Sequence, residues 1–466
     1  MQPSASRHRA AMKAFTKGAV LAAGASFGLL AAIPGSAALT LTEALVAAYN
    51  NNPTLLAQRA RLRESDEGVS QALSGWRPTV QFTGSAGFQS SSTTGFATST
   101  LHPRELDLNV TQPVYNGGRT VAATSQAENT VRSTRAQTLA TEQTVLFSVV
   151  SAYMDVVQNQ AVLDLSINNE QVLRRQLEAT QDQFRVGEMT RTDVAQAESR
   201  LAAATASRVQ AEGTLETSRA TFERVVGEPP GLLQPPTERP VLPANRAEAA
   251  NLAANNNPNV IAAQFVEAAA RDNVRVVRSQ LLPQISIVGD LNRSIDTSTT
   301  LHGLTTDSAS VTARMTVPLY EGGQIYSQTR QAFETIGQRR SELDDTRRQV
   351  VQTAQQDWEA LQADRANIRS LIETIRAAEI ALEGVRQEAL VGSRTVLDIL
   401  DAEQELFTDR VNLVRAQHDE VVTEFDLGQQ IGRLTAVDLK LPVEIYNFDT
   451  HYKAVRDKWI GFSPSD

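Results

Sequence analysis

The sequence contains no cysteine, few aromatic residues and no clustered histidines. The absence of cysteine among 466 residues excludes disulfides, thiolate metal sites and a lipid-modified cysteine. The five histidines are scattered without ligand spacing, and no nucleotide-binding loop or nucleophile elbow is present. We therefore expect no enzyme: no catalytic residue, no metal and no cofactor. Aromatic residues make up only 5% of the chain, and segments rich in Leu, Ala, Gln, Arg and Glu dominate, which is typical of long helices.

Residues 1–38 have the pattern of a secretory signal peptide. A basic region is followed by an apolar run, Ala19–Ile33, and by small residues that predict cleavage after Ala37 or Ala38. The apolar run is shorter than the ~20 residues that a membrane-spanning helix needs. Removing the four cations of this segment changes the formal net charge from −9 to −13. An acidic, exported chain is not suited to binding nucleic acid.

The mature chain repeats itself at an offset of 205 residues, which indicates a duplicated structural unit. Asn50–Pro53 returns as Asn255–Pro258, and Pro113–Gly118 returns as Pro318–Gly323. We predict a first repeat at 39–227, a Pro-rich crossover at 228–245, a second repeat at 246–433 and a C-terminal equatorial tail at 434–466. The prolines of the crossover exclude a helix, and its apolar residues favour an ordered connection.

Each repeat is predicted to begin with a helix and to continue with a β-hairpin. Asn-Pro pairs open helices at 53–75 and 258–281, and the apolar period then changes to two. The alternation predicts β-hairpins at 79–112 and 284–317, with Ser/Thr-rich loops at 90–103 and 292–307. The four strands have about ten residues each, the length of a tilted membrane-spanning strand.

A half-buried soluble sheet is the commoner source of such alternation, but four strands are too few to complete a sandwich. They also leave open edges that lipid does not tolerate, so other subunits must close the sheet. Two copies would give eight strands, and three copies would give twelve with room for a lumen.

Two long helices are the largest predicted elements. Residues 119–186 contain neither Gly nor Pro, and 324–391 contain only two glycines. Each would run roughly 100 Å at 1.5 Å per residue. Helices of this length need a packed partner, and the three-four spacing of their apolar residues predicts a coiled coil. Return helices at 192–226 and 396–431 can supply that partner, with the short helix of the same repeat stacked end to end to complete the length.

The order of helix, Pro-started hairpin, Tyr-x-Gly-Gly, long helix, Val-Gly-x-x-Thr-x-x-Asp turn and return helix, all twice, resembles the TolC-like exit ducts of Gram-negative outer membranes. The resemblance implies a homotrimer in which a twelve-stranded outer-membrane β-barrel, four strands per chain, continues into a periplasmic α-helical coiled-coil barrel. It implies a passive duct for tripartite efflux or type I secretion that works with a periplasmic adaptor, an inner-membrane ABC or RND transporter and outer-membrane lipid.

The C-terminal residues 447–461 resemble the short tail of members associated with type I secretion, and Tyr452 and Trp459 are expected to pack against the equatorial belt. A periplasmic coiled-coil scaffold or adaptor without a barrel is the alternative function.

The turns that end the long helices are also duplicated. Gly187 and Gly392 suit the left-handed position after a helix. Thr190 with Asp193, and Thr395 with Asp398, have capping-box spacing, which favours a structural role for both acids.

Asp401 differs, because its repeat counterpart is Gln196 while it shares a helical face with Asp398. In a trimer these two aspartates would form a ring of six acids, and such rings select cations and can bind divalent ions.

The resemblance implies that Asp398 and Asp401 form a periplasmic gate. It also matches Arg394 and Asp193 to a link that holds neighbouring coiled coils closed. The family pattern has a Tyr three residues before the second glycine, where this chain has Ala389, so one hydrogen bond of the lock is expected to be absent. The hairpin tips, represented by Gly187, Thr190, Gly392 and Thr395, are the predicted docking surface for the adaptor.

Overall fold

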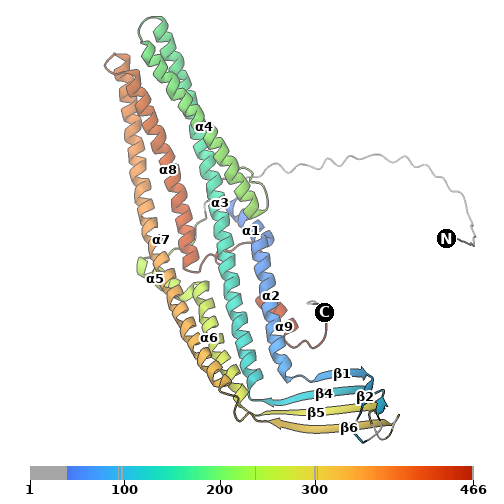
Figure 1. The fold of residues 1–466 in the computed structure, drawn as a ribbon. Helices are drawn as coiled ribbons and strands as arrows, with labels where there is room; N and C mark the ends of the chain where they lie inside the picture. The colour runs from blue at the N-terminus through green and yellow to red at the C-terminus, as the bar shows by residue number, and fades with distance from the viewer. Residues whose placement is uncertain are drawn as a thin grey trace, which may run out of the picture. The chain divides into compact units, whose positions relative to one another are not determined.

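The computed structural model describes residues 39–463 except 93, 96, 97, 237, 299, 300 and 302, so the predicted signal peptide lies outside the described residues. The described part of the chain combines long helices with one four-stranded sheet (Figure 1). None of the helices in these residues is both long enough and apolar enough to cross a membrane.

The helices follow the duplicated order. The described helices are α1 (Leu41–Asn51), α2 (Pro53–Leu73), α3 (Arg119–Arg185), α4 (Arg191–Val226), α5 (Arg246–Asn256), α6 (Pro258–Arg278), α7 (Gln324–Leu390), α8 (Val396–Gln430) and α9 (Phe448–Val455), with 3-10 turns η1 (Ser74–Trp76) and η2 (Ser279–Leu281). We call α3 with α4 the first hairpin, and α7 with α8 the second hairpin. Helices α1, α5 and α9 lie outside the predicted helices, whereas η1 and η2 fall at the ends of the helices predicted at 53–75 and 258–281.

The predicted end-to-end stacking of short and return helices is confirmed by one repeated contact. The Asn52 side chain accepts from the backbone of Thr54 and so caps α2, while its amide donates to the Val225 carbonyl near the end of α4. Asn257 caps α6 in the same way and donates to the Gln430 carbonyl at the end of α8. Each Asn-Pro pair therefore starts one helix and joins it to the end of another, which completes a column beside the long helix.

Helices α1 and α5 have clear capping residues, although neither helix was predicted from the apolar period. Thr40 and Glu43 form a capping box at the start of α1, and the Asn245 side chain accepts from Glu248 at the start of α5. Both helices end at the Asn-Pro pair. Because the apolar runs in α1 and α5 are short, the apolar period predicted helix only from Pro53 and Pro258 onwards.

The two predicted β-hairpins form one antiparallel sheet. It contains β1 (Thr79–Ala86), β4 (Arg104–Asn116), β5 (Gln284–Ile295) and β6 (Thr305–Thr316), in the order β1-β4-β5-β6. The predicted hairpin end at 112 is wrong, because β4 continues to Asn116 across an irregularity between Pro113 and Tyr115.

The predicted loop bounds are also too wide. The region 90–103 contains a small pair, β2 (Gln89–Ser91) with β3 (Ser99–Leu101). The loop predicted at 292–307 is shorter, because Asn292–Ile295 and Thr305–Asp307 remain paired in the ladder. The Ser/Thr-rich composition concealed these strand ends.

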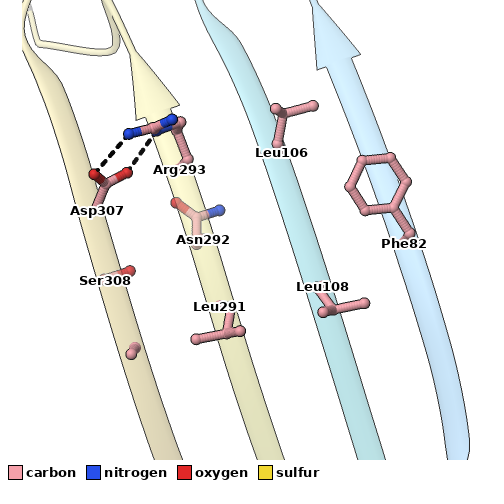
Figure 2. Close-up of a pocket in the computed structure, with 9 residues that line it drawn as sticks. Phe82, Leu106, Leu108, Leu291, Asn292, Arg293, Asp307 and Ser308 are labelled. Carbon is pink, nitrogen blue, oxygen red and sulfur yellow. Dashed lines mark hydrogen bonds and ion pairs between the residues drawn. The ribbon is translucent and has the colours of Figure 1, made fainter.

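One face of the sheet is mainly apolar, with the Arg293–Asp307 ion pair towards one end, and the other face is polar. Phe82, Leu108 and Leu291 lie opposite one another on adjacent strands, and Figure 2 shows them along the same surface. The next residues along each strand are polar, so Thr83, Asp107 and Asn292 share the other face. Apolar side chains such as Phe82 and Val311 are exposed in the single chain. An exposed apolar face of this extent marks a surface that another apolar phase covers.

The main core lies at mid-length of the first hairpin and holds the crossover in place. Its largest buried side chains include Tyr49, Tyr153, Phe222 and Phe425. The Tyr153 hydroxyl lies 2.9 Å from the Leu39 carbonyl oxygen and 2.8 Å from that of Gln234, which belongs to the crossover. The expectation of an ordered, non-helical crossover is therefore confirmed for its described residues.

The C-terminal tail packs along α2 and α3 through α9. Tyr452 packs on the cluster of Leu62, Val69 and Val131, as predicted, and the Arg135 guanidinium lies 5.3 Å from its ring. The corresponding prediction for Trp459 is wrong, because this side chain is 65% exposed. The Lys458 carbonyl beside it accepts from Ser70 and Arg77, and the Arg77 guanidinium stacks on the indole ring while most of that side chain stays exposed.

Candidate gate at the helical hairpin tips

Both hairpins turn through the same backbone motif. Val186 is the C-cap residue of α3, and Gly187 follows with a φ of 86°. The Glu188 N–H donates to the Gln183 carbonyl and the Gly187 N–H to the Phe184 carbonyl, which is a Schellman ending. The second hairpin repeats it at Gly392, with a φ of 78°. The left-handed positions predicted for both glycines are confirmed.

Capping boxes start both return helices, as the spacing predicts. The Thr190 hydroxyl accepts from the Asp193 N–H, and the Asp193 carboxylate accepts from the Thr190 N–H at 2.9 Å. Thr395 and Asp398 form the same box, with 2.8 Å for the equivalent bond.

These hydrogen bonds lower the pKa of both carboxyl groups. The Thr190 hydroxyl is the larger cause for Asp193, and the Thr395 backbone is the larger cause for Asp398. Both acids are therefore anionic at neutral pH.

Arg394 is held within its own turn. Its Nε donates to a Glu388 carboxylate oxygen at 2.9 Å, and this contact is the main cause that raises its pKa. Asp193 is occupied by its own capping box. Within one chain Arg394 therefore contacts Glu388 and not Asp193, and the link implied by the resemblance stays a prediction for neighbouring copies.

Asp401 joins the two hairpins. Its carboxylate pairs with Arg200 of α4, so the charge that distinguishes the second repeat is balanced from the first hairpin. Both side chains are more than one-third exposed, and a pair of this kind is worth little free energy. The sequence offered a signal, because Arg200 lies one helical turn beyond Gln196, the repeat counterpart of Asp401.

An apolar contact beside this ion pair was not predicted. Val396 and Leu400, one turn apart at the start of α8, are buried with Leu173 of α3 and Ala204 of α4. Leu400 is only 1% exposed. We call these four residues the tip cluster. The carboxylates Asp398 and Asp401 flank Leu400 in the sequence, so the tip cluster fixes the helix that carries both acids.

The tips also expose apolar side chains. Phe184 and Val186 are exposed at the first tip, and Leu390 and Val391 at the second. Such residues are available for contact with another protein. Among the described residues of one chain, no three His, Asp or Glu side chains gather as metal ligands.

Comparisons with known proteins agree on one family. A family model described as outer membrane efflux protein matches residues 44–228 and again 249–433, two stretches that are 205 residues apart. The outer membrane efflux protein BepC of Brucella suis is 36% identical over 93% of this chain and 94% of its own length. The outer membrane protein TolC of Vibrio cholerae is 28% identical over 86% of this chain and 92% of its own length. Among solved structures, CusC matches with a TM-score of 0.76 over 84% of this chain and 92% of the CusC chain, at 16% identity.

Proposed function

Because this chain belongs to the outer membrane efflux protein family, it is a channel of the Gram-negative outer membrane that extends into the periplasm, and we propose that three copies form one duct closed at its periplasmic end. The predicted resemblance to TolC-like exit ducts and the predicted fold class are thereby confirmed. As a member of this family, the chain serves as an exit duct for efflux or type I secretion.

The open sheet supports assembly of several copies. Strands β1 and β6 each have one unpaired edge in the single chain. Unpaired backbone groups are too costly in lipid, so β1 of one copy must pair with β6 of the next. Three copies give twelve strands, with the apolar face towards lipid and the polar face towards a lumen. The long helices α3 and α7 follow β4 and β6 in the chain and would surround the axis as a tunnel.

The tip geometry supports the gate assignment, and this observation carries the proposal. Asp398 is anionic and lies on the outside of the tip cluster, while Asp401 is anchored to the neighbouring hairpin by Arg200. Three such arrangements around one axis would place six acids at a constriction. We infer that separation of the second hairpin from the first breaks the Asp401–Arg200 pair and widens this ring.

The exposed tips support docking of a periplasmic adaptor. Phe184, Val186, Leu390 and Val391 surround the two turns and offer apolar contact area on a polar, rigid frame. The duct has no energy source of its own in this proposal, so an ABC or RND transporter of the inner membrane would drive the export. Gly187, Thr190, Gly392 and Thr395 would fix the shape of the docking surface rather than contact the adaptor strongly.

Conductance of the full chain in planar bilayers tests the gate. Asp398→Asn combined with Asp401→Asn should reduce cation selectivity and block by divalent ions. The matched control is Asp344→Asn with Asp345→Asn, which removes the same charge from exposed positions on α7. Equal selectivity in the gate variant and the unaltered channel would refute the gate assignment.

The link between Arg394 and a neighbouring copy has a separate test. Arg394→Ser should loosen the closed entrance and raise single-channel conductance, because it removes both the Glu388 contact and any contact to Asp193 of another copy. Glu388→Gln removes only the contact within the turn and is the control. If both variants conduct like the unaltered channel, Arg394 is not part of a lock.

A further inference from the structure

The last described residues form an exposed apolar segment that the channel function does not use. We call Lys458–Ser463 the tail tip. Trp459 is 65% exposed, Ile460 is 89% exposed and Phe462 is fully exposed. Three large apolar side chains within four residues are unusual on a water-facing surface, which favours a second apolar phase as their environment.

The tail tip is held in a defined place by α2 and by Arg77, between η1 and β1. The Lys458 carbonyl accepts from Arg77 Nη1 at 2.7 Å and lies 3.3 Å from the Ser70 hydroxyl. The Arg77 guanidinium lies 5.2 Å from the Trp459 ring centroid. The Lys458 ammonium donates to the Ser463 carbonyl, which closes the segment into a loop. The exposed side chains are therefore presented by an anchored loop.

The tail tip lies at the end of the sheet where strands meet helices. Arg77 is two residues before β1, and Trp76 beside it is exposed. Leu282, just before β5, and Tyr115, near the end of β4, are exposed at the same end. Aromatic residues gather in this way at the water interfaces of membrane-spanning strands. The tail tip is thus continuous with the border of the lipid-facing sheet.

The tail tip also lies on the outside of the duct. Helix α9 packs on α2 and α3 through Tyr452 and through the Arg135–Asp449 ion pair. A duct must keep its axis open, so an added helix on its columns belongs on the outer surface. From there the tail tip faces the periplasmic leaflet of the outer membrane.

We propose that the tail tip inserts into the phospholipid headgroup region of this leaflet. Trp459, Ile460 and Phe462 enter the boundary between headgroups and acyl chains, where an indole can bury its ring and keep its N–H in a polar layer. Arg77 and Lys458 flank the indole and bring positive charge to the phosphate level. The tail tip thus gives the chain, which has no cysteine to carry a lipid, a second contact with the membrane beside the sheet.

Lipid contact of Trp459 can be measured directly, because the chain has only three tryptophans. Trp76→Phe with Trp358→Phe leaves Trp459 as the only indole. The full chain is reconstituted in phosphatidylethanolamine–phosphatidylglycerol vesicles with or without phospholipid brominated near the glycerol end of its acyl chains. We expect brominated lipid to quench Trp459 emission. The control, Trp76→Phe with Trp459→Phe, leaves Trp358, which packs on the α5–α8 cluster and should not be quenched.

One result would overturn the proposal. Trp459 emission that brominated lipid leaves unchanged, as for Trp358, excludes lipid as the neighbour. If that emission is also shielded from acrylamide in water, a neighbouring copy of the chain covers the tail tip.

A single substitution serves if the double variants do not assemble. Trp459→Phe in the otherwise unaltered chain should lower the fraction of emission that lipid quenches. An equal or higher fraction contradicts the proposal.

Discussion

The long helices α3 and α7 have the same length and very different surroundings. Each has 67 residues, yet 24 residues of α3 are buried and only six of α7. Helix α3 packs against α1, α2, α4, α6 and α8, whereas α7 packs against α5, α6 and α8 (Figure 1). The two copies of the repeat therefore share their turn and capping motifs but differ in how their long helices pack. The first hairpin is built into its own chain, and the second leaves most of one long helix available to another copy.

The change is visible at single repeat positions within the helices. Ala152 of α3 is buried in the main core, and its counterpart in α7 is Asp357. Thr221 of α4 corresponds to Asp426 of α8. Burial raises the pKa of both aspartates, and Asp357 Oδ2 is buried without a hydrogen-bond partner among the described residues. The second hairpin therefore carries two acids where the first has a buried alanine and an exposed threonine.

This difference indicates which hairpin moves. The second hairpin meets the first near the tips through the tip cluster and the Arg200–Asp401 pair. Its own two helices are joined by ion pairs such as Arg386–Glu403 and Arg410–Glu379. We infer that the tip end of the second hairpin swings at these contacts, while Phe425 holds the other end of α8 in the main core and the first hairpin remains fixed. Three substitutions test this comparison, in order of decreasing effect.

Leu400→Ala should have the largest effect, because it empties the centre of the tip cluster. A buried Leu→Ala change costs roughly 2–5 kcal/mol, and here the loss would weaken the attachment of the second hairpin to Leu173 and Ala204. We expect higher conductance and faster protease cleavage at the second tip. The control is Leu397→Ala, which truncates a 38% exposed side chain on the same turn and should change stability by less than about 0.5 kcal/mol. Equal behaviour of the two variants would show that the hairpins are not held together here.

Asp357→Asn should remove the part of the pH dependence of folding stability that Asp357 of the second hairpin causes. Burial, and secondly Asp426, raises the pKa of Asp357 from 3.8 to about 7. The folded chain then keeps a proton that the unfolded chain releases above pH 3.8. Stability is therefore full below that pH and falls as the pH rises through about 7.

Three pKa units correspond to ~4 kcal/mol, and partial solvent exposure of Asp357 reduces this to about 1–2 kcal/mol. Thermal unfolding at pH 5 and pH 8 should show a smaller loss for Asp357→Asn than for the unaltered chain. Asp344→Asn, an exposed acid on the same helix, should leave the loss unchanged. A full pH dependence in Asp357→Asn would assign it to other groups.

The sequence predicted those features whose cause is local. Gly187 and Gly392 need a left-handed backbone, and Thr190 and Thr395 need an acid three residues on, so both turns could be derived from short patterns. The order of the elements followed in the same way from changes of period. The predicted gate acids are correctly located on a return helix, but their partners were not predictable from these patterns.

Contacts between distant segments depend on how the hairpins cross. Arg200 and Asp401 are 201 residues apart, and Leu400 is buried only because α8 approaches α3 and α4 at that level. Tyr452 and Trp459 were both expected to pack, but only Tyr452 lies against a buried cluster while Trp459 is exposed. The direction of the chain after α9 decides whether a side chain there packs on the helices or stays exposed, and no residue pattern encodes that direction.

The Arg200–Asp401 pair offers the finest test, because its free energy is small and its electrostatic effect is specific. An exposed pair contributes about 0.2–1 kcal/mol, so Arg200→Gln alone should barely change unfolding. It should nevertheless raise cation selectivity, since Asp401 then loses the charge that balances it, whereas Asp401→Asn should lower it. In the Asp401→Asn background, Arg200→Gln should act only as the loss of a distant positive charge, and the difference between the two backgrounds measures the coupling.

Coupling that persists at high salt would mean that the pair is buried in the assembled duct, because salt screens exposed charges and leaves buried pairs largely unaffected. The second hairpin would then be clamped by its neighbours, and the asymmetry between α3 and α7 would be a property of the single chain alone.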